Sequence, residues 1–105
     1  MKKKLVPDPP LETCTTAPAI FGSCEAGHAP LYSVNPGIAA HDALVHISLH
    51  LRCAYDSGHH LMEQADPGSK RMLWTTLHSV DAAKGLVDAL LDGIEARALS
   101  NATAT

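Results

Sequence analysis

Apolar and small residues recur at alternating spacings of four and three over the middle of the chain. The stripe comprises Ala40, Leu44, Ile47, Leu51, Ala54, Gly58, Leu61 and Ala65. At about 100° per residue, positions with this spacing stay on one side of an α-helix. Gly58 costs the helix roughly 1 kcal/mol relative to alanine, but within the stripe it lets a partner helix approach closely. The spacing therefore predicts a long amphipathic helix that begins near Ile38.

A second helix is predicted from Pro67 to Asp92. Asp66 before Pro67 has the form of an N-cap followed by proline at the first helical position. The expected seam of this helix is Leu73, Leu77, Val80, Val87, Leu91 and Ile94, widened by Met72, Thr76, Ala83, Leu86 and Leu90. These residues span roughly half of the circumference. Gly93 is expected to end the helix as its C′ residue.

The predicted fold is all-α, an antiparallel two-helix hairpin over residues 38–94. Two helices cannot bury a half-circumference apolar arc against each other alone, and a core of this size is marginal. A homodimer that forms a four-helix bundle solves both problems. The alternative is a monomer whose N-terminal arm folds back over the stripe.

Residues 1–37 are predicted to form an extended, partly disordered arm, and residues 95–105 a flexible tail. The arm holds six of the seven prolines, which exclude helix over most of its length. The segment "LYSV", residues 31–34, is its only strand-like piece and ends at the turn signal "NPG". It has no evident partner strand.

Four ligand-type residues form a row on the first predicted helix. Asp42, His46, His50 and Cys53 are spaced four, four and three residues apart. Two histidines at this spacing can share one metal ion. The ends of the row, however, lie about 16 Å apart at 1.5 Å per residue, so further ligands must come from elsewhere. These could be a second copy, Cys14, or the loosely matching "CEAGH" (residues 24–28). A solvated histidine face is favoured over a metal site, and no metal or other cofactor is assigned.

Composition and charge exclude several function classes. The net charge of −3 and the single basic cluster, Lys2 to Lys4, argue against a nucleic-acid binder. There is no apolar run long enough to span a membrane. Three widely spaced cysteines make a poor disulfide framework and favour a cytoplasmic location. No nucleophile–base set and no phosphate loop is present, so no enzyme activity and no catalytic residue are predicted.

Three apolar residues lie away from the predicted seams. Val45 and Leu49 fall beside Arg52 and Asp56, and Trp74 projects toward the polar side near His78. A tryptophan is rarely left in water, so either the arm, which is the favoured occupant, or another protein covers Trp74. Val45, Leu49 and Trp74 are the candidate partner interface.

The segments "VPDPP", "LYSVNPGI", "ALVHISLHL" and "HSVDAAKGLVDALLDGI" resemble a family of short bacterial proteins, frequent in pseudomonads. That family is described only as a domain of unknown function. The resemblance covers roughly residues 5–10 and 31–94, and it implies a small, mostly helical cytoplasmic protein without assigned site residues. The sequence is thus interpreted as a non-enzymatic protein that acts by self-association and protein contacts, with a regulatory or adaptor role as the natural interpretation. The alternative is a small metal-binding protein that uses the histidines of the first helix.

Overall fold

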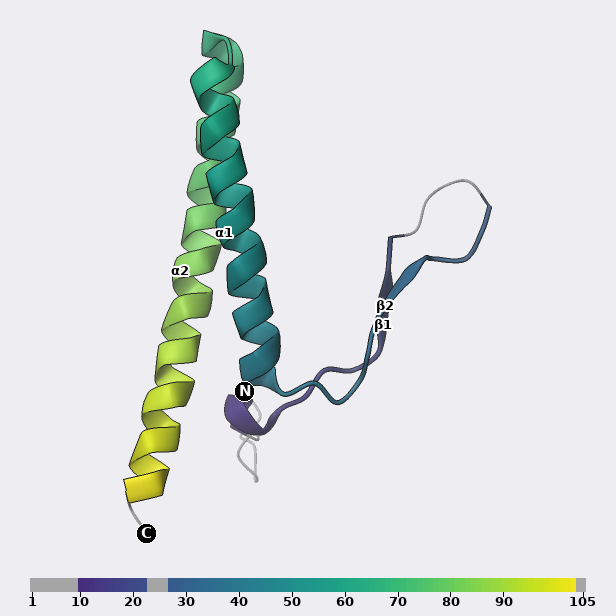
Figure 1. Cartoon of the computed structure of the whole chain (residues 1–105), viewed down its shortest axis with the longest axis vertical. Helices are drawn as coiled ribbons and strands as arrows, with labels where there is room; N and C mark the ends of the chain where they lie inside the picture. The colour runs from purple at the N-terminus through teal and green to yellow at the C-terminus, as the bar shows by residue number, and fades with distance from the viewer. Residues whose placement is uncertain (1–9, 23–26, 104–105) are drawn as a thin grey trace, which may run out of the picture. The chain divides into compact units, whose positions relative to one another are not determined.

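The computed structural model describes residues 10–22 and 27–103, which divide into two units between Ala43 and Leu44. The elements in chain order are the 3-10 helix η1 (Leu11–Thr13), strands β1 (Ala19–Phe21) and β2 (Tyr32–Val34), and helices α1 (Ala40–Gln64) and α2 (Pro67–Thr103) (Figure 1). The protein is mostly helical, with two long helices as predicted. The all-α prediction is incomplete, because the arm contains a small sheet.

The arm forms a two-stranded antiparallel ribbon. Strands β1 and β2 pair in the register Ala19 with Val34 and Phe21 with Tyr32. The rings of Phe21 and Tyr32 stack across the strands with centroids 5.3 Å apart. Gly22 follows at φ +74°, and a Cβ atom there would lie 2.5 Å from the Tyr32 ring. The prediction that "LYSV" has no partner strand was therefore wrong.

A group of hydrogen bonds joins the two legs of the ribbon at its base. The Thr16 amide donates to the Ile38 carbonyl, and the Ile38 amide donates to the Thr16 hydroxyl oxygen. That hydroxyl in turn donates to the carbonyl of Asn35 over 2.7 Å. The Ala40 amide, at the start of α1, donates to the Cys14 carbonyl over 2.9 Å. These bonds explain why the arm is ordered here in spite of its prolines.

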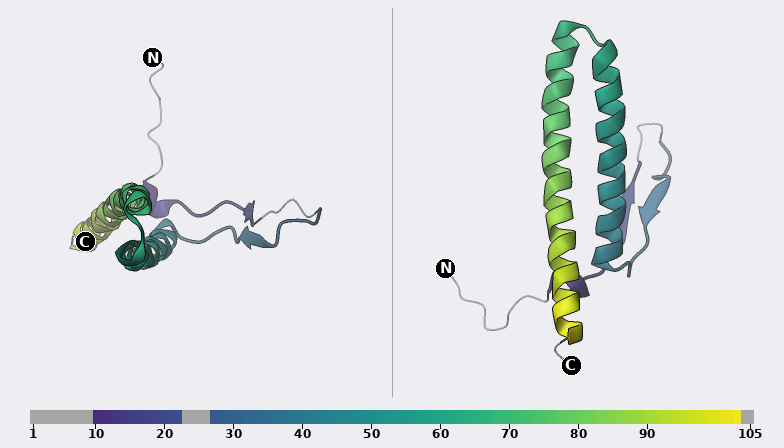
Figure 2. Two further views of the ribbon diagram at one scale, coloured as in Figure 1. Left: turned by 90° about the horizontal axis from the view of Figure 1, so that it is seen from above. Right: turned by 60° about the vertical axis from the view of Figure 1, so that its left-hand side comes forward.

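The helical unit is an antiparallel hairpin with a tight connection (Figure 2). Asp66 caps α2 as the sequence predicts, because its carboxylate accepts the Ser69 amide over 2.8 Å and the Ser69 hydroxyl over 3.2 Å. Those two bonds, the backbone one first, hold the pKa of Asp66 below its ordinary value. Pro67 occupies the first helical position, where its missing amide leaves no bond unmade.

Helix α2 is longer than predicted. It continues through Gly93 to Thr103, so the predicted helix end at Asp92 was wrong, and residues 95–103 of the predicted tail are helical. Residues 95–99, "EARAL", are good helix formers, and their summed propensity outweighs the roughly 1 kcal/mol that one internal glycine costs.

The seam between the helices follows a seven-residue repeat. On α2 it is formed by the predicted residues, of which Leu77 and Ile94 are buried, with 5% and 8% of their surfaces exposed. On α1 the half-buried seam positions are Leu44, Ser48, Leu51, Tyr55, Gly58, Met62 and Ala65. Of the predicted α1 stripe, Leu44, Leu51, Gly58 and Ala65 therefore lie in the seam. Ile47, Ala54 and Leu61 lie outside the seam and are exposed.

Candidate interaction surfaces

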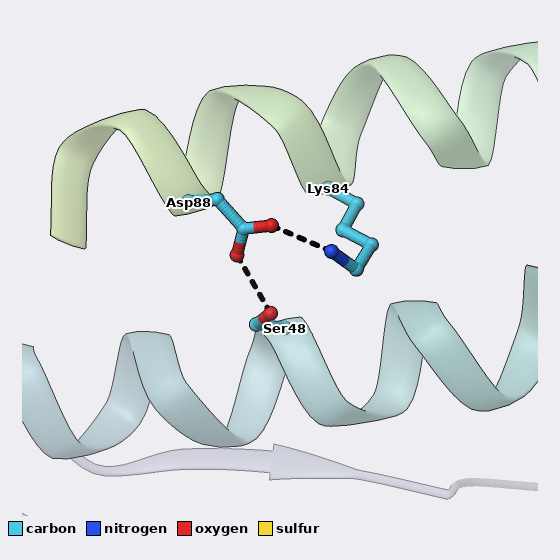
Figure 3. A network of polar contacts seen from close by, with 3 residues as sticks. All are labelled: Ser48, Lys84 and Asp88. Carbon is cyan, nitrogen blue, oxygen red and sulfur yellow. Dashed lines mark hydrogen bonds and ion pairs between the residues drawn. The ribbon is translucent and has the colours of Figure 1, made fainter. Parts of the chain in front are cut away.

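A polar network crosses the seam near the middle of the hairpin (Figure 3). The Ser48 hydroxyl of α1 donates to Oδ1 of Asp88 on α2 over 2.7 Å. Lys84 Nζ donates to the other carboxylate oxygen of Asp88 over 2.6 Å, within α2. The hydrogen bond from Lys84, and then that from Ser48, hold the pKa of Asp88 below its ordinary value. Polar partners inside a helical seam fix the register of the helices more than they add stability.

One side of the hairpin is a continuous uncharged surface, here named the apolar face. Residues that flank the seam on the same side of two antiparallel helices share one face, and on this side they are Ile47, Ala54, Leu61, Met72, Thr76, Ser79, Ala83, Leu86 and Leu90. Met72 and Leu86 expose 75% and 70% of their surfaces. Between Ile47 and Ile94, this side of the described helices carries no Asp, Glu, Lys or Arg. A contiguous exposed apolar surface of this kind is a candidate interaction site.

The opposite side carries the charges and is named the charged face. It includes Arg52, Asp56, Glu63, Arg71 and Asp81. The candidate residues Val45, Leu49 and Trp74 all lie on this side, with Val45 half-buried and Leu49 exposed. Leu49 and Trp74 are separated by about 18 Å along the hairpin at 1.5 Å per residue. They share a face but do not form one contiguous patch.

A groove opens on the charged face beside Trp74. It is lined by Met62 and Glu63 of α1 and by Lys70, Arg71 and Trp74 of α2, with a volume of about 420 Å³. The indole of Trp74 is 61% exposed within the molecule and stacks on His78 with ring centroids 5.5 Å apart and planes 4° from parallel. The helical hairpin itself therefore does not shield Trp74, and coverage of Trp74 by the arm stays a prediction.

The groove was not identified from the sequence, although Trp74 was. Lys70 and Arg71 stand directly after the helix cap and look like ordinary solvated residues in a pattern of apolar spacing. The sequence did contain one signal for it. Lys70 and Arg71 precede Trp74 by four and three residues, a spacing that makes them neighbours of Trp74 on one side of α2.

The histidine row does not assemble into a metal centre. His46, His50 and Cys53 are exposed on α1, and Cys14 and Cys53 are free thiols. Across the described ranges 10–22 and 27–103, no three His, Cys, Asp or Glu side chains lie close enough together to hold one ion. The "CEAGH" segment falls mostly outside the described residues. The geometry of one copy therefore gives no support to the metal-binding alternative.

The chain matches one family model, that of the proteins of unknown function termed DUF3077, over residues 15–93. The protein belongs to this family. The match begins in the arm and includes the ribbon, all of α1 and most of α2. No curated protein and no solved structure matches the chain. In the described part of this DUF3077 protein, neither α1 nor α2 has the length and apolarity needed to cross a membrane.

Proposed function

We propose that this DUF3077 protein is a non-enzymatic helical protein that works by self-association and by contacts with other proteins. Two hairpins join through their apolar faces into a four-helix bundle, and the charged faces point outward to meet partners. A regulatory or adaptor role in the cytoplasm fits a small body of this kind.

The observation that carries this proposal is the distribution of side-chain size. The inner seam includes the small or polar residues Ser48, Gly58 and Lys84, whereas the large apolar side chains of Met72 and Leu86 are exposed outside it. Among the described residues only Leu77 and Ile94 are buried. A hairpin arranged in this way keeps too small a core for independent stability and gains most by covering its outer face.

A second copy is the occupant that fits the apolar face best. The face is two helices wide and runs about 27 Å along α2 at 1.5 Å per residue, from Met72 to Leu90. It can meet itself across a two-fold axis without opposing like charges, because the acidic groups lie on the other side. A negatively charged chain self-associates more readily through an uncharged surface than through any other.

The test is the mass of the full-length protein in solution, by light scattering coupled to gel filtration. A dimer of two 11.1 kDa chains is expected at micromolar concentration. Leu86→Glu places a charge in the apolar face and should shift the mass toward the monomer. The matched control, Leu49→Glu, puts the same charge on the opposite face and should leave the dimer intact. A wild-type monomer at all concentrations up to millimolar, or equal loss in both variants, contradicts the proposal.

A further inference from the structure

We infer that the groove beside Trp74 is a docking site for an acidic peptide segment of another protein, with an apolar side chain seated between Met62 and the indole. The inference deepens the proposed function, because it rests on the protein acting through protein contacts. It does not depend on the dimer, since all five lining residues belong to one hairpin and lie on the charged face.

The floor of the groove suits a leucine or an aromatic side chain. Trp74 offers a large flat ring that is fixed in orientation by its stack on His78. Met62 faces it from α1 and is half-buried, and its thioether adapts to irregular apolar shapes. An exposed tryptophan at the centre of a shallow groove is the residue type that most often dominates a protein contact.

The charges around the groove select the sign of the partner. Within the described residues, Lys70 and Arg71 form no ion pair or side-chain hydrogen bond, whereas the carboxylate of Asp66, at the cap of α2, is engaged by Ser69. The groove thus presents two uncompensated cations against one carboxylate, that of Glu63. A segment that carries Asp or Glu on the α2 side of its apolar residue complements this arrangement, and a basic one does not.

Nucleic acid and membrane fit the same groove poorly. Both offer dense negative charge over a wide area, and the rest of the charged face carries Asp56, Asp81 and Asp92, which would oppose them. A peptide places its few carboxylates locally, beside Lys70 and Arg71 alone.

Trp74 is the only tryptophan of the chain, so its fluorescence reports on the groove directly. The experiment titrates full-length protein with a blocked, tryptophan-free peptide that has Leu-Phe at its centre and glutamates on both sides. We expect red-shifted emission from the free protein and a saturable blue shift with peptide. The double variant Lys70→Gln with Arg71→Gln should weaken binding about tenfold, the loss of two exposed ion pairs. Glu63→Gln should instead strengthen it, and Arg52→Gln, on the same face but outside the groove, should leave it unchanged.

Four results of the titrations would overturn the inference. They are the absence of a shift at millimolar peptide, equal binding of a peptide with glutamine in place of glutamate, tighter binding of a lysine peptide, and an equal response to octanoate, which would indicate a small anionic ligand. Blue-shifted emission of the free protein that reddens when residues 1–36 are deleted would assign the groove to the arm and overturn it as well. Circular dichroism checks that each variant is folded. Repeating the titration with Leu86→Glu separates failure of the peptide site from failure of self-association, because light scattering measures the second independently.

Discussion

The inner seam and the apolar face of the same hairpin both carry large apolar side chains, but they differ in the residues that stand between them. The seam contains a glycine, a serine and a lysine–aspartate pair, and Gly58 is so close to α2 that a Cβ there would lie 2.5 Å from a methyl carbon of Leu77. The apolar face, which is exposed, carries five leucine, isoleucine or methionine side chains, namely Ile47, Leu61, Met72, Leu86 and Leu90. The seam is therefore built for close approach and defined register, and the outer face for area.

The contacts that align the two helices and the most exposed apolar side chains therefore lie on separate surfaces of the hairpin. The hydrogen bond between Ser48 and Asp88 favours one register of the two helices, but it removes no apolar surface from water by itself. The larger side chains outside the seam contribute to stability only when something covers them. The hairpin thus specifies its own geometry and leaves several large apolar side chains exposed on its outer face.

The largest expected effect comes from a charge inside the seam. Leu77→Asp puts a carboxylate at the most buried position of the described chain, which costs several kcal/mol unless the group stays protonated. We expect the helical circular dichroism signal and the cooperative melt to be lost at every protein concentration.

Leu49→Asp is the control for that change. Leu49 is 52% exposed on the charged face, and a surface substitution of this kind alters stability by no more than about 0.5 kcal/mol. If Leu77→Asp melted like the wild type, or if both variants were equally damaged, the distinction between seam and surface would be wrong.

The side of α1 that faces α2 could be predicted only in part from the sequence. Leu44, Leu51, Gly58 and Ala65 belong to two overlapping stripes, one completed by Ile47, Ala54 and Leu61, the other by Ser48, Tyr55 and Met62. Apolarity favours the first stripe, and the structure places the second in the seam. The phase of α1 depends on the pairing with α2, to which the hydrogen bond of Ser48 with Asp88 belongs, and such a long-range contact is invisible in the periodicity of one helix.

Local chemistry was read more reliably than pairing. The Asp66–Pro67 cap was predicted correctly, because all of its hydrogen bonds lie within four residues. The ribbon was missed, because its strands have three residues each and pair over separations of 11 to 15 residues. The hydrogen bonds at its base span even more of the chain, such as the 19 residues between Thr16 and Asn35. On the charged face, Trp74 was identified because it is a large apolar residue on a polar side of its helix. The groove beside it could not be predicted, because Met62 and Glu63 line it from the other helix.

Smaller changes in stability, of opposite sign, are expected when alanine replaces each of two glycines. Gly58→Ala gains about 1 kcal/mol of helix propensity but forces Leu77 to move, and overpacking of a close contact costs about 1–3 kcal/mol. We expect a net loss of stability on urea unfolding. Gly85→Ala meets no atom within 4 Å and should gain the propensity term alone. If Gly58→Ala were stabilised as much as Gly85→Ala, the helices would not be as close as the seam requires.

The smallest expected effect is the pH response of the polar network. The hydrogen bonds from Lys84 and Ser48 lower the pKa of Asp88 in the folded protein, below the ordinary value of 3.8 that applies when the chain is unfolded. The stabilisation from this carboxylate is therefore fully present above pH about 4 and is lost as the pH falls through the lowered pKa. Asp88→Asn removes this contribution, so its stability should lie below that of the wild type at neutral pH, and the two should converge under acid.

Urea unfolding of both proteins between pH 2 and pH 7, at one protein concentration, measures this convergence. The capping carboxylate of Asp66 also has a lowered pKa and contributes an acid response of the same sign, but it is common to both proteins and cancels in their difference. Ser48→Ala is the graded control, since it removes the interhelical donor and leaves the stronger contact with Lys84 in place. Its difference from the wild type should follow the same pH dependence with a smaller amplitude. Parallel curves of stability against pH for wild type and Asp88→Asn would mean that the carboxylate is not charged within the network. The register of the helices would then be determined by the shape of the seam and not by this polar pair.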